Sequence, residues 1–323
     1  MAALHDIYFR YGKEDRTSCQ KLRLEAIILS KSTVFIVSSG DRTIAAQRCL
    51  TYIDMPDYSG KQIYVKPNFN TADPAPGSTH NDTLETLLSM VRSSNPKRII
   101  IGERSGPAQV SEVFKEKGIS ALCDKYGAEF LNLEELPADE WVKIEREGLH
   151  WPGGFEVPKA LVESDAIVAA CCLKTHGFGG VYSNALKLAV GLVPKDFQKL
   201  HGSPDIRKMI AEINLAFTPD FVLSDAVEVF TDGGPMDGKR CRADVTLISR
   251  DRVAIDAVGI ALLQSLGSNS VIMDTPIFSQ EQIARAVELG LGASSPDDIV
   301  IEADDEAGKQ VAARISEFLY KTR

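Results

Sequence analysis

The chain has 323 residues, 44% hydrophobic and 25% charged, a balance typical of a globular protein with a sizeable core. Its formal net charge of -9 argues against nucleic acid as a partner, because a phosphate backbone attracts basic surfaces. The charged opening stretch "MAALHDIYFRYGKEDR" does not resemble a secretory signal, and no apolar run is long enough to predict a membrane-spanning helix. Six cysteines without a C-x-x-C spacing favour a reduced, cytoplasmic protein.

Short apolar strands and amphipathic helices alternate along the first half of the chain. We expect strands at 33–39, 62–68, 97–103, 128–135 and 166–174. We expect helices at 80–94, 109–127 (one helix or two) and 158–165. Ser78 or Thr79 is the expected N-cap of the first of these helices.

The second half continues the alternation. We expect helices at 180–193, 204–217, 253–267, 279–292 and 306–320, and strands at 220–230, 243–250 and 298–304. The pattern predicts an α/β fold with a mostly parallel sheet and helices on both faces.

The domain organisation follows from the segments that interrupt this alternation. Residues 1–32 are interpreted as an N-terminal extension and 33–323 as a single α/β domain. The same order of elements also allows two lobes with the site between them. A loop-rich insertion is expected at 134–157 and a turn-rich loop at 231–242.

Polar residues gather where the strand at 62–68 ends. The candidates for ligand binding in this stretch are Lys66, Asn68, Ser78, Thr79 and His80. A helix N-terminus with neighbouring hydroxyl groups is suited to an anion. The alternative is a capping loop with a solvated lysine.

A second cluster, "KTHGFGGVYSNALK", follows the strand at 166–174. Its candidates are Lys174, His176, Gly179, Gly180, Ser183 and Lys187, and the glycines would let a ligand approach the backbone closely. Cations beside a helix start suit a carboxylate or a phosphate. The alternative is a glycine turn with surface lysines and a hydrogen-bonded histidine.

These clusters lead to one hypothesis, because parallel strands end at the same edge of a sheet. Lys66, Lys174, His176 and Lys187 are predicted to form a single cationic pocket, with His201 contributed by a following loop.

Four further residues carry predictions of their own. Asp225, at the end of another strand, is a further ligand-binding candidate, and Asp256 is expected to be buried and hydrogen-bonded. Cys171 and Cys172 should point to opposite faces of their strand and act as packing residues.

The motifs "VKPNFN", "LKTHGFGGVYSNALK", "LSDAVEVF", "GGPMDG" and "SRDRVAIDAVG" resemble the domain of unknown function 362 family in order and spacing, from about residue 33 to about 300. Many members of that family carry a fused ferredoxin-like module with iron–sulfur clusters. This sequence shows no such module, so an iron–sulfur cluster is not expected. The family usually has Lys-Asn where this chain has Lys187-Leu188.

His176, Lys187 and His201 also follow an order similar to that of the nickel-pincer lactate racemase superfamily. That weaker resemblance implies a metal or a nickel-containing organic cofactor, with His176 and His201 as metal ligands or general bases and the lysines neutralising a substrate carboxylate.

The leading hypothesis is a cytoplasmic enzyme that acts on a small anionic metabolite by proton or hydride transfer next to a carboxylate. His176, His201 and Lys187 are its candidate catalytic residues. The alternative is a non-catalytic accessory protein that binds a cofactor or an iron–sulfur cluster. The sequence leaves open whether the protein is catalytic, which substrate it takes and how it oligomerises.

Overall fold

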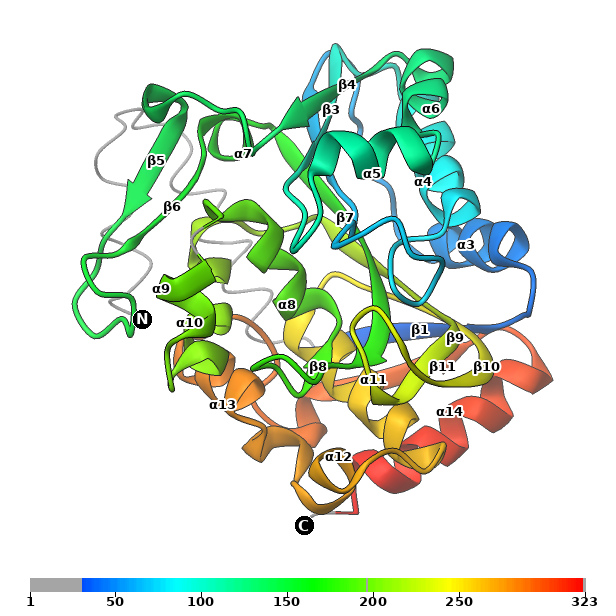
Figure 1. Ribbon diagram of the computed structural model, residues 1–323. Helices are drawn as coiled ribbons and strands as arrows, with labels where there is room; N and C mark the ends of the chain where they lie inside the picture. The colour runs from blue at the N-terminus through cyan, green and yellow to red at the C-terminus, as the bar shows by residue number, and fades with distance from the viewer. Residues whose placement is uncertain (1–30, 196, 322–323) are drawn as a thin grey trace, which may run out of the picture.

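The computed structural model describes residues 31–195 and 197–321. Nine strands of this part of the chain form one sheet in the order β11-β1-β10-β9-β7-β2-β3-β4, with β8 paired to β7 (Figure 1). Their bounds are β1 (Ser32–Ser38), β2 (Gln62–Lys66), β3 (Arg98–Glu103), β4 (Ala128–Asn132), β7 (Ala166–Thr175), β8 (Tyr182–Ser183), β9 (Phe221–Gly233), β10 (Gly238–Ser249) and β11 (Ile299–Ala303). The expected N-terminal extension lies outside the described residues, apart from its last two.

The sheet is mostly parallel, which confirms the predicted fold class. Strands β4, β3, β2, β7 and β9 run parallel to one another, and β11 runs parallel to β1. Strand β10 is antiparallel to both of its neighbours, and β8 is antiparallel to β7. Every residue of β7 is buried, as expected of a central strand that helices cover on both sides.

Helices cover both faces of the sheet (Figure 1). One face is covered by α3 (Arg42–Thr51), α4 (Asn81–Ser93), α5 (Val110–Glu116) and α6 (Ile119–Tyr126). The other is covered by α7 (Lys159–Val162), α8 (Ala185–Leu188), α10 (Ile206–Ile213), α11 (Arg252–Ser265), α12 (Ser270–Asp274), α13 (Glu281–Glu288) and α14 (Glu306–Leu319). A short helix, α9 (Phe197–His201), precedes α10. No helix in the described ranges is long and apolar enough to cross a membrane.

Several expected boundaries were wrong. The range 180–193 is not one helix but strand β8, then α8, then a 3-10 turn at Ala189–Leu192. The expected loop at 231–242 belongs mostly to β9 and β10, which form a long hairpin. Residues 134–157 include a second hairpin, β5 (Trp141–Ile144) with β6 (Phe155–Pro158). These strands depend on pairing with a partner strand, which local periodicity does not reveal. The division into two lobes stays a prediction.

The N-cap of α4 also differs from the expectation. His80 occupies that position, and its ring nitrogen Nδ1 accepts a hydrogen bond from the backbone of Asp82 at 3.2 Å. Thr79 is instead turned toward the sheet, where its hydroxyl donates to the carbonyl of Ala170 at 2.9 Å. An imidazole therefore replaces the expected hydroxyl at the start of this helix.

Candidate functional site

The parallel arrangement brings the carboxyl ends of β2, β3 and β7 to one edge of the sheet. Lys66 ends β2 and Glu103 ends β3, while Lys174 lies near the end of β7. In the register of the sheet Lys66 stands opposite Ala169, so β7 continues well beyond the end of β2. The loops that follow these strands enclose the space beside the longer strand.

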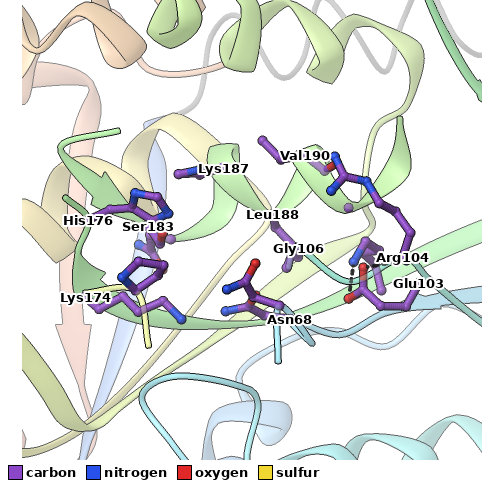
Figure 2. Close-up of a pocket in the computed structure, with 15 residues that line it drawn as sticks. Asn68, Glu103, Arg104, Gly106, Lys174, His176, Ser183, Lys187, Leu188 and Val190 are labelled. Atoms are coloured by element: carbon purple, nitrogen blue, oxygen red, sulfur yellow. Dashed lines mark hydrogen bonds and ion pairs between the residues drawn. The ribbon is translucent and has the colours of Figure 1, made fainter. Parts of the chain in front are cut away.

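A cavity of about 60 Å³ lies there. Its charged and titratable lining consists of Lys66, Glu103, Arg104, Lys174, His176 and Lys187. Asn68, Asn70, Ser183 and Asn184 add amides and a hydroxyl. Figure 2 shows Lys174, His176, Ser183 and Lys187 toward one end of the cavity and Glu103 with Arg104 toward the other. Six of the residues selected from the sequence line it, namely Lys66, Asn68, Lys174, His176, Ser183 and Lys187.

Lys66 is held in a buried ion pair. Its ammonium group lies 2.6 Å from the carboxylate of Glu103 and also donates to the carbonyl of Pro67. Burial lowers the pKa of Lys66 and raises that of Glu103, and their mutual attraction opposes both shifts. Gly191 leaves room for this pair, because a Cβ atom at that position would lie 2.8 Å from Lys66 Nζ. Lys66 therefore contributes mainly to the wall of the cavity.

Lys174 is fixed by carbonyl groups rather than by a carboxylate. Its Nζ donates to the carbonyl oxygens of Pro76 at 2.8 Å and Gly77 at 2.6 Å. An ammonium group has three donors, so one remains for a ligand. Burial lowers the pKa of Lys174 to about 8. The loop between β2 and α4 thus fixes the ammonium group of Lys174 in the lining of the cavity.

Lys187, on α8, lies near two further cations. Burial first, and then the charges of Arg104 and Lys174, lower its pKa to about 7. At neutral pH its amine is therefore present in both the charged and the neutral form. A group that titrates near the working pH can both give and take a proton.

His176 follows the end of β7 and is half-buried. Its Nδ1 accepts a hydrogen bond from the backbone of Phe178 at 3.2 Å, so the proton of the neutral ring is on Nε2. Burial, followed by the charges of Lys187 and Lys174, lowers its pKa well below the usual value. His201, at the end of α9, does not line the cavity. Burial and the charges of Lys187 and Arg104 lower its pKa to about 4.

The turn between β7 and α8 is shaped by glycines. Gly179 has a φ of 73°, a conformation that favours glycine. At Gly180 a Cβ atom would lie 2.8 Å from Lys187 Cε and 3.3 Å from His176 Nδ1. Gly180 therefore leaves the space in which these two side chains approach the same point. Neither Gly179 nor Gly180 lines the cavity itself.

A buried carboxylate holds α8 in place. Asp256, on α11, accepts hydrogen bonds from the backbone of Ala185 at 2.7 Å and Leu186 at 3.3 Å, and from the hydroxyl of Tyr182 at 2.9 Å. The expectation that Asp256 is buried and hydrogen-bonded is confirmed. Burial raises its pKa to about 7, against the effect of these hydrogen bonds. Asp256 thereby fixes the helix that carries Lys187.

Other sequence-selected residues lie elsewhere. The Ser78 hydroxyl donates to the carbonyl of Thr71, and Thr79 and His80 have the structural contacts described above. Asp225 accepts a hydrogen bond from Thr83 at 3.1 Å and forms a salt bridge with Arg42 at 2.8 Å, away from the cavity lining. The structure therefore does not bring these four residues to the cationic cavity.

Sequence reasoning missed Arg104. Its guanidinium donates to the carbonyl oxygens of Val193 at 2.9 Å and Val190 at 2.8 Å, which fixes it in the cavity wall. Burial lowers its pKa, while Glu103 and Glu134 oppose that shift. The signal was present in "GERSG", because Glu103 and Arg104 stand at the end of a strand just as Lys66 does.

Metal ligation by His176 and His201 stays a prediction. Among the residues that the structure describes, no three His, Cys, Asp or Glu side chains gather to hold a metal ion. Cys171 and Cys172 are both buried in β7. The thiol of Cys171 donates to the amide oxygen of Asn184, which precedes α8. Burial raises the pKa of Cys172, and a hydrogen bond with Thr79, which precedes α4, opposes that rise. The two cysteines thus face opposite layers, as expected.

The family model of DUF362, a domain of unknown function, matches residues 63–261. The chain belongs to the DUF362 family. The matched region runs from β2 into α11 and contains the cavity-lining residues named above. Among curated proteins, a search finds no match to this DUF362 chain.

Solved structures with a similar fold include the following two. One is the lactate racemase apoprotein from Thermoanaerobacterium thermosaccharolyticum, with 13% identity and a TM-score of 0.45 over 91% of this chain and 87% of that one. The other is a Thermotoga maritima protein, with 16% identity and a TM-score of 0.42 over 62% of this chain and 52% of that one.

Proposed function

We propose that this protein is an enzyme that binds a small anionic metabolite by its carboxylate and transfers a proton next to that carboxylate. One observation carries the proposal: the cavity holds three buried cations that form no salt bridge among the described residues. These are Arg104, Lys174 and Lys187, whereas the Glu103 carboxylate is already paired with Lys66. Buried charge without a counter-ion is costly, so a bound anion would stabilise the cavity.

The residues divide into two roles. Lys174, which is fixed by two carbonyl groups, is positioned to bind the carboxylate together with the amide of Asn68. Lys187, with a pKa of about 7, is the proton-transferring group, and neutral His176 orients the substrate by a hydrogen bond from Nε2. We propose proton rather than hydride transfer because amines and imidazoles carry protons.

A nickel-containing organic cofactor, implied by the weaker resemblance, does not fit the cavity lined by Lys174, His176 and Lys187. His176 and His201 are the candidate ligands, and only His176 lines the cavity. A cavity of about 60 Å³ is also small beside the several hundred Å³ of ordinary cofactor sites. No step of the proposed reaction therefore passes through such a cofactor.

The proposal predicts binding of small carboxylates with a specific pH dependence. Calorimetric titration with glycolate and with pyruvate should show saturable binding at pH 7. Because the carboxylate favours the charged form of Lys174, affinity should fall above pH 8, by up to about tenfold per pH unit.

Two matched variants test whether binding depends on Lys174 or on any lysine of the protein. Lys174→Met should lose binding, whereas Lys115→Met, at an exposed position on α5, should bind as the parent does. Proton NMR in deuterated water should then show exchange of the methylene protons of glycolate, which stand on the carbon next to the carboxylate. Binding that is absent, or that is unchanged in Lys174→Met, would refute the proposed site.

A further inference from the structure

The three buried lysines of the cavity differ in how their amino groups are held. Lys66 is paired with Glu103 at 2.6 Å, and Lys174 donates to two carbonyl oxygens. No group among the described residues accepts a hydrogen bond from Lys187 Nζ, although its side chain is buried. Lysines that only supply charge are anchored here, and Lys187 is not.

The surroundings of Lys187 disfavour its ammonium form. Arg104 and Lys174 place like charges near it, and Leu188 adds an apolar group to the same wall. The end of its side chain packs closely against Gly180, where a Cβ atom would lie 2.8 Å from Lys187 Cε. A desolvated amine next to other cations is the arrangement that makes a lysine nucleophilic toward carbonyl carbon.

We infer that Lys187 is a nucleophile that forms an imine with a small 2-oxo acid, an inference that rests on the proposed carboxylate site. Lys174 would hold the carboxylate, which places the adjacent carbonyl carbon before the free amine of Lys187. A volume of about 60 Å³ limits the substrate to a few non-hydrogen atoms. The chemical class is therefore a short 2-oxo acid rather than a long-chain one.

The step balances without a further reactant. The neutral amine nitrogen attacks the carbonyl carbon, a C–N bond forms, and the π bond of the carbonyl opens to a hydroxyl group. Both amine hydrogens leave with that oxygen as one molecule of water, and a C=N bond remains. Once protonated, the imine draws electrons from neighbouring bonds and acidifies the adjacent C–H. With pyruvate this proton leaves the methyl carbon for solvent water, because the nitrogen of Lys187 is then part of the imine and is no longer a free base.

Reductive trapping tests the inference. The intact protein is incubated with pyruvate and then with sodium borohydride, and mass spectrometry should show one reduced adduct. Peptide mapping should place that adduct on Lys187. Lys187→Met should give no adduct, and Lys115→Met, at an exposed lysine, should give the parent amount. Lys187→Arg keeps the charge and should bind pyruvate in calorimetry without forming an adduct.

The outcomes distinguish this inference from the proposed function. An adduct mapped to another lysine, or none while pyruvate still binds, overturns the imine and leaves the carboxylate site intact. Failure to bind pyruvate and glycolate overturns both. Mapping on the unaltered protein decides the matter even where a variant does not fold.

Discussion

The buried amine of Lys187 should make the ligand-free protein less stable than it would be with an apolar side chain. Its pKa is lowered from 10.5 to about 7. At about 1.4 kcal/mol per pH unit, this corresponds to about 5 kcal/mol of destabilisation of the charged form, taken as an upper limit. Lys187→Met keeps a side chain of similar length and removes the charge. We therefore expect the variant to be more stable at pH 6 while it loses the imine adduct.

The gain in stability should depend on pH in one direction. Below pH 7 the lysine is charged in both the folded and the unfolded state, so the folded state bears the full penalty. Between pH 7 and 10.5 the folded state becomes neutral first, and the penalty declines. From pH 6 to pH 9 the advantage of Lys187→Met should shrink by about 2–3 kcal/mol.

Urea unfolding at pH 6 and pH 9 measures this difference, with Lys115→Met as the exposed control that should show neither effect. A Lys187→Met protein that is less stable than the parent at pH 6 would refute the reasoning. So would an advantage that is the same at both pH values.

Two further substitutions test the supports of the site. Asp256→Ala should lower the free energy of unfolding by about 1–3 kcal/mol, because it leaves buried donors at the start of α8 unpaired. Its control is Asp274→Ala, at an exposed position, which should have little effect in the same urea titration. Gly191→Ala should cost about 1–3 kcal/mol by crowding the buried Lys66 ion pair, and an unchanged denaturation midpoint would contradict that role. Gly177→Ala is its control, since an added Cβ would meet only the carbonyl of Gly234 at 3.4 Å.

The convergence of Lys66, Lys174 and Lys187 could be predicted from the sequence because it follows from simple rules. Apolar runs marked β2 and β7 as buried strands, and parallel strands end at one edge. The glycine-rich stretch after β7 indicated a tight turn into a helix. These signals lie within short stretches of sequence, so each could be recognised without knowing which strands pair in the sheet.

The parts that the sequence did not reveal depend on contacts between distant segments. Asp225 was selected as a strand end like Lys66, yet β9 continues beyond it to Gly233. Its carboxylate pairs with Arg42 of α3, a helix that had not been predicted. Arg104 reaches the cavity because the carbonyls of Val190 and Val193 accept its hydrogen bonds. A polar residue at a strand end is therefore a candidate whose role is decided by the partner that the fold provides.

Leu188 shows how a single departure from the family pattern bears on this chemistry. The resemblance gives Asn at this position, and in this chain the leucine lines the cavity directly after Lys187. An asparagine amide could accept or donate hydrogen bonds in the cavity, which a leucine cannot do. The leucine instead adds apolar surface, and apolar surface increases the penalty for charge on the neighbouring amine. The departure from the family pattern therefore favours the neutral form of Lys187, which is the form that the proposed imine requires.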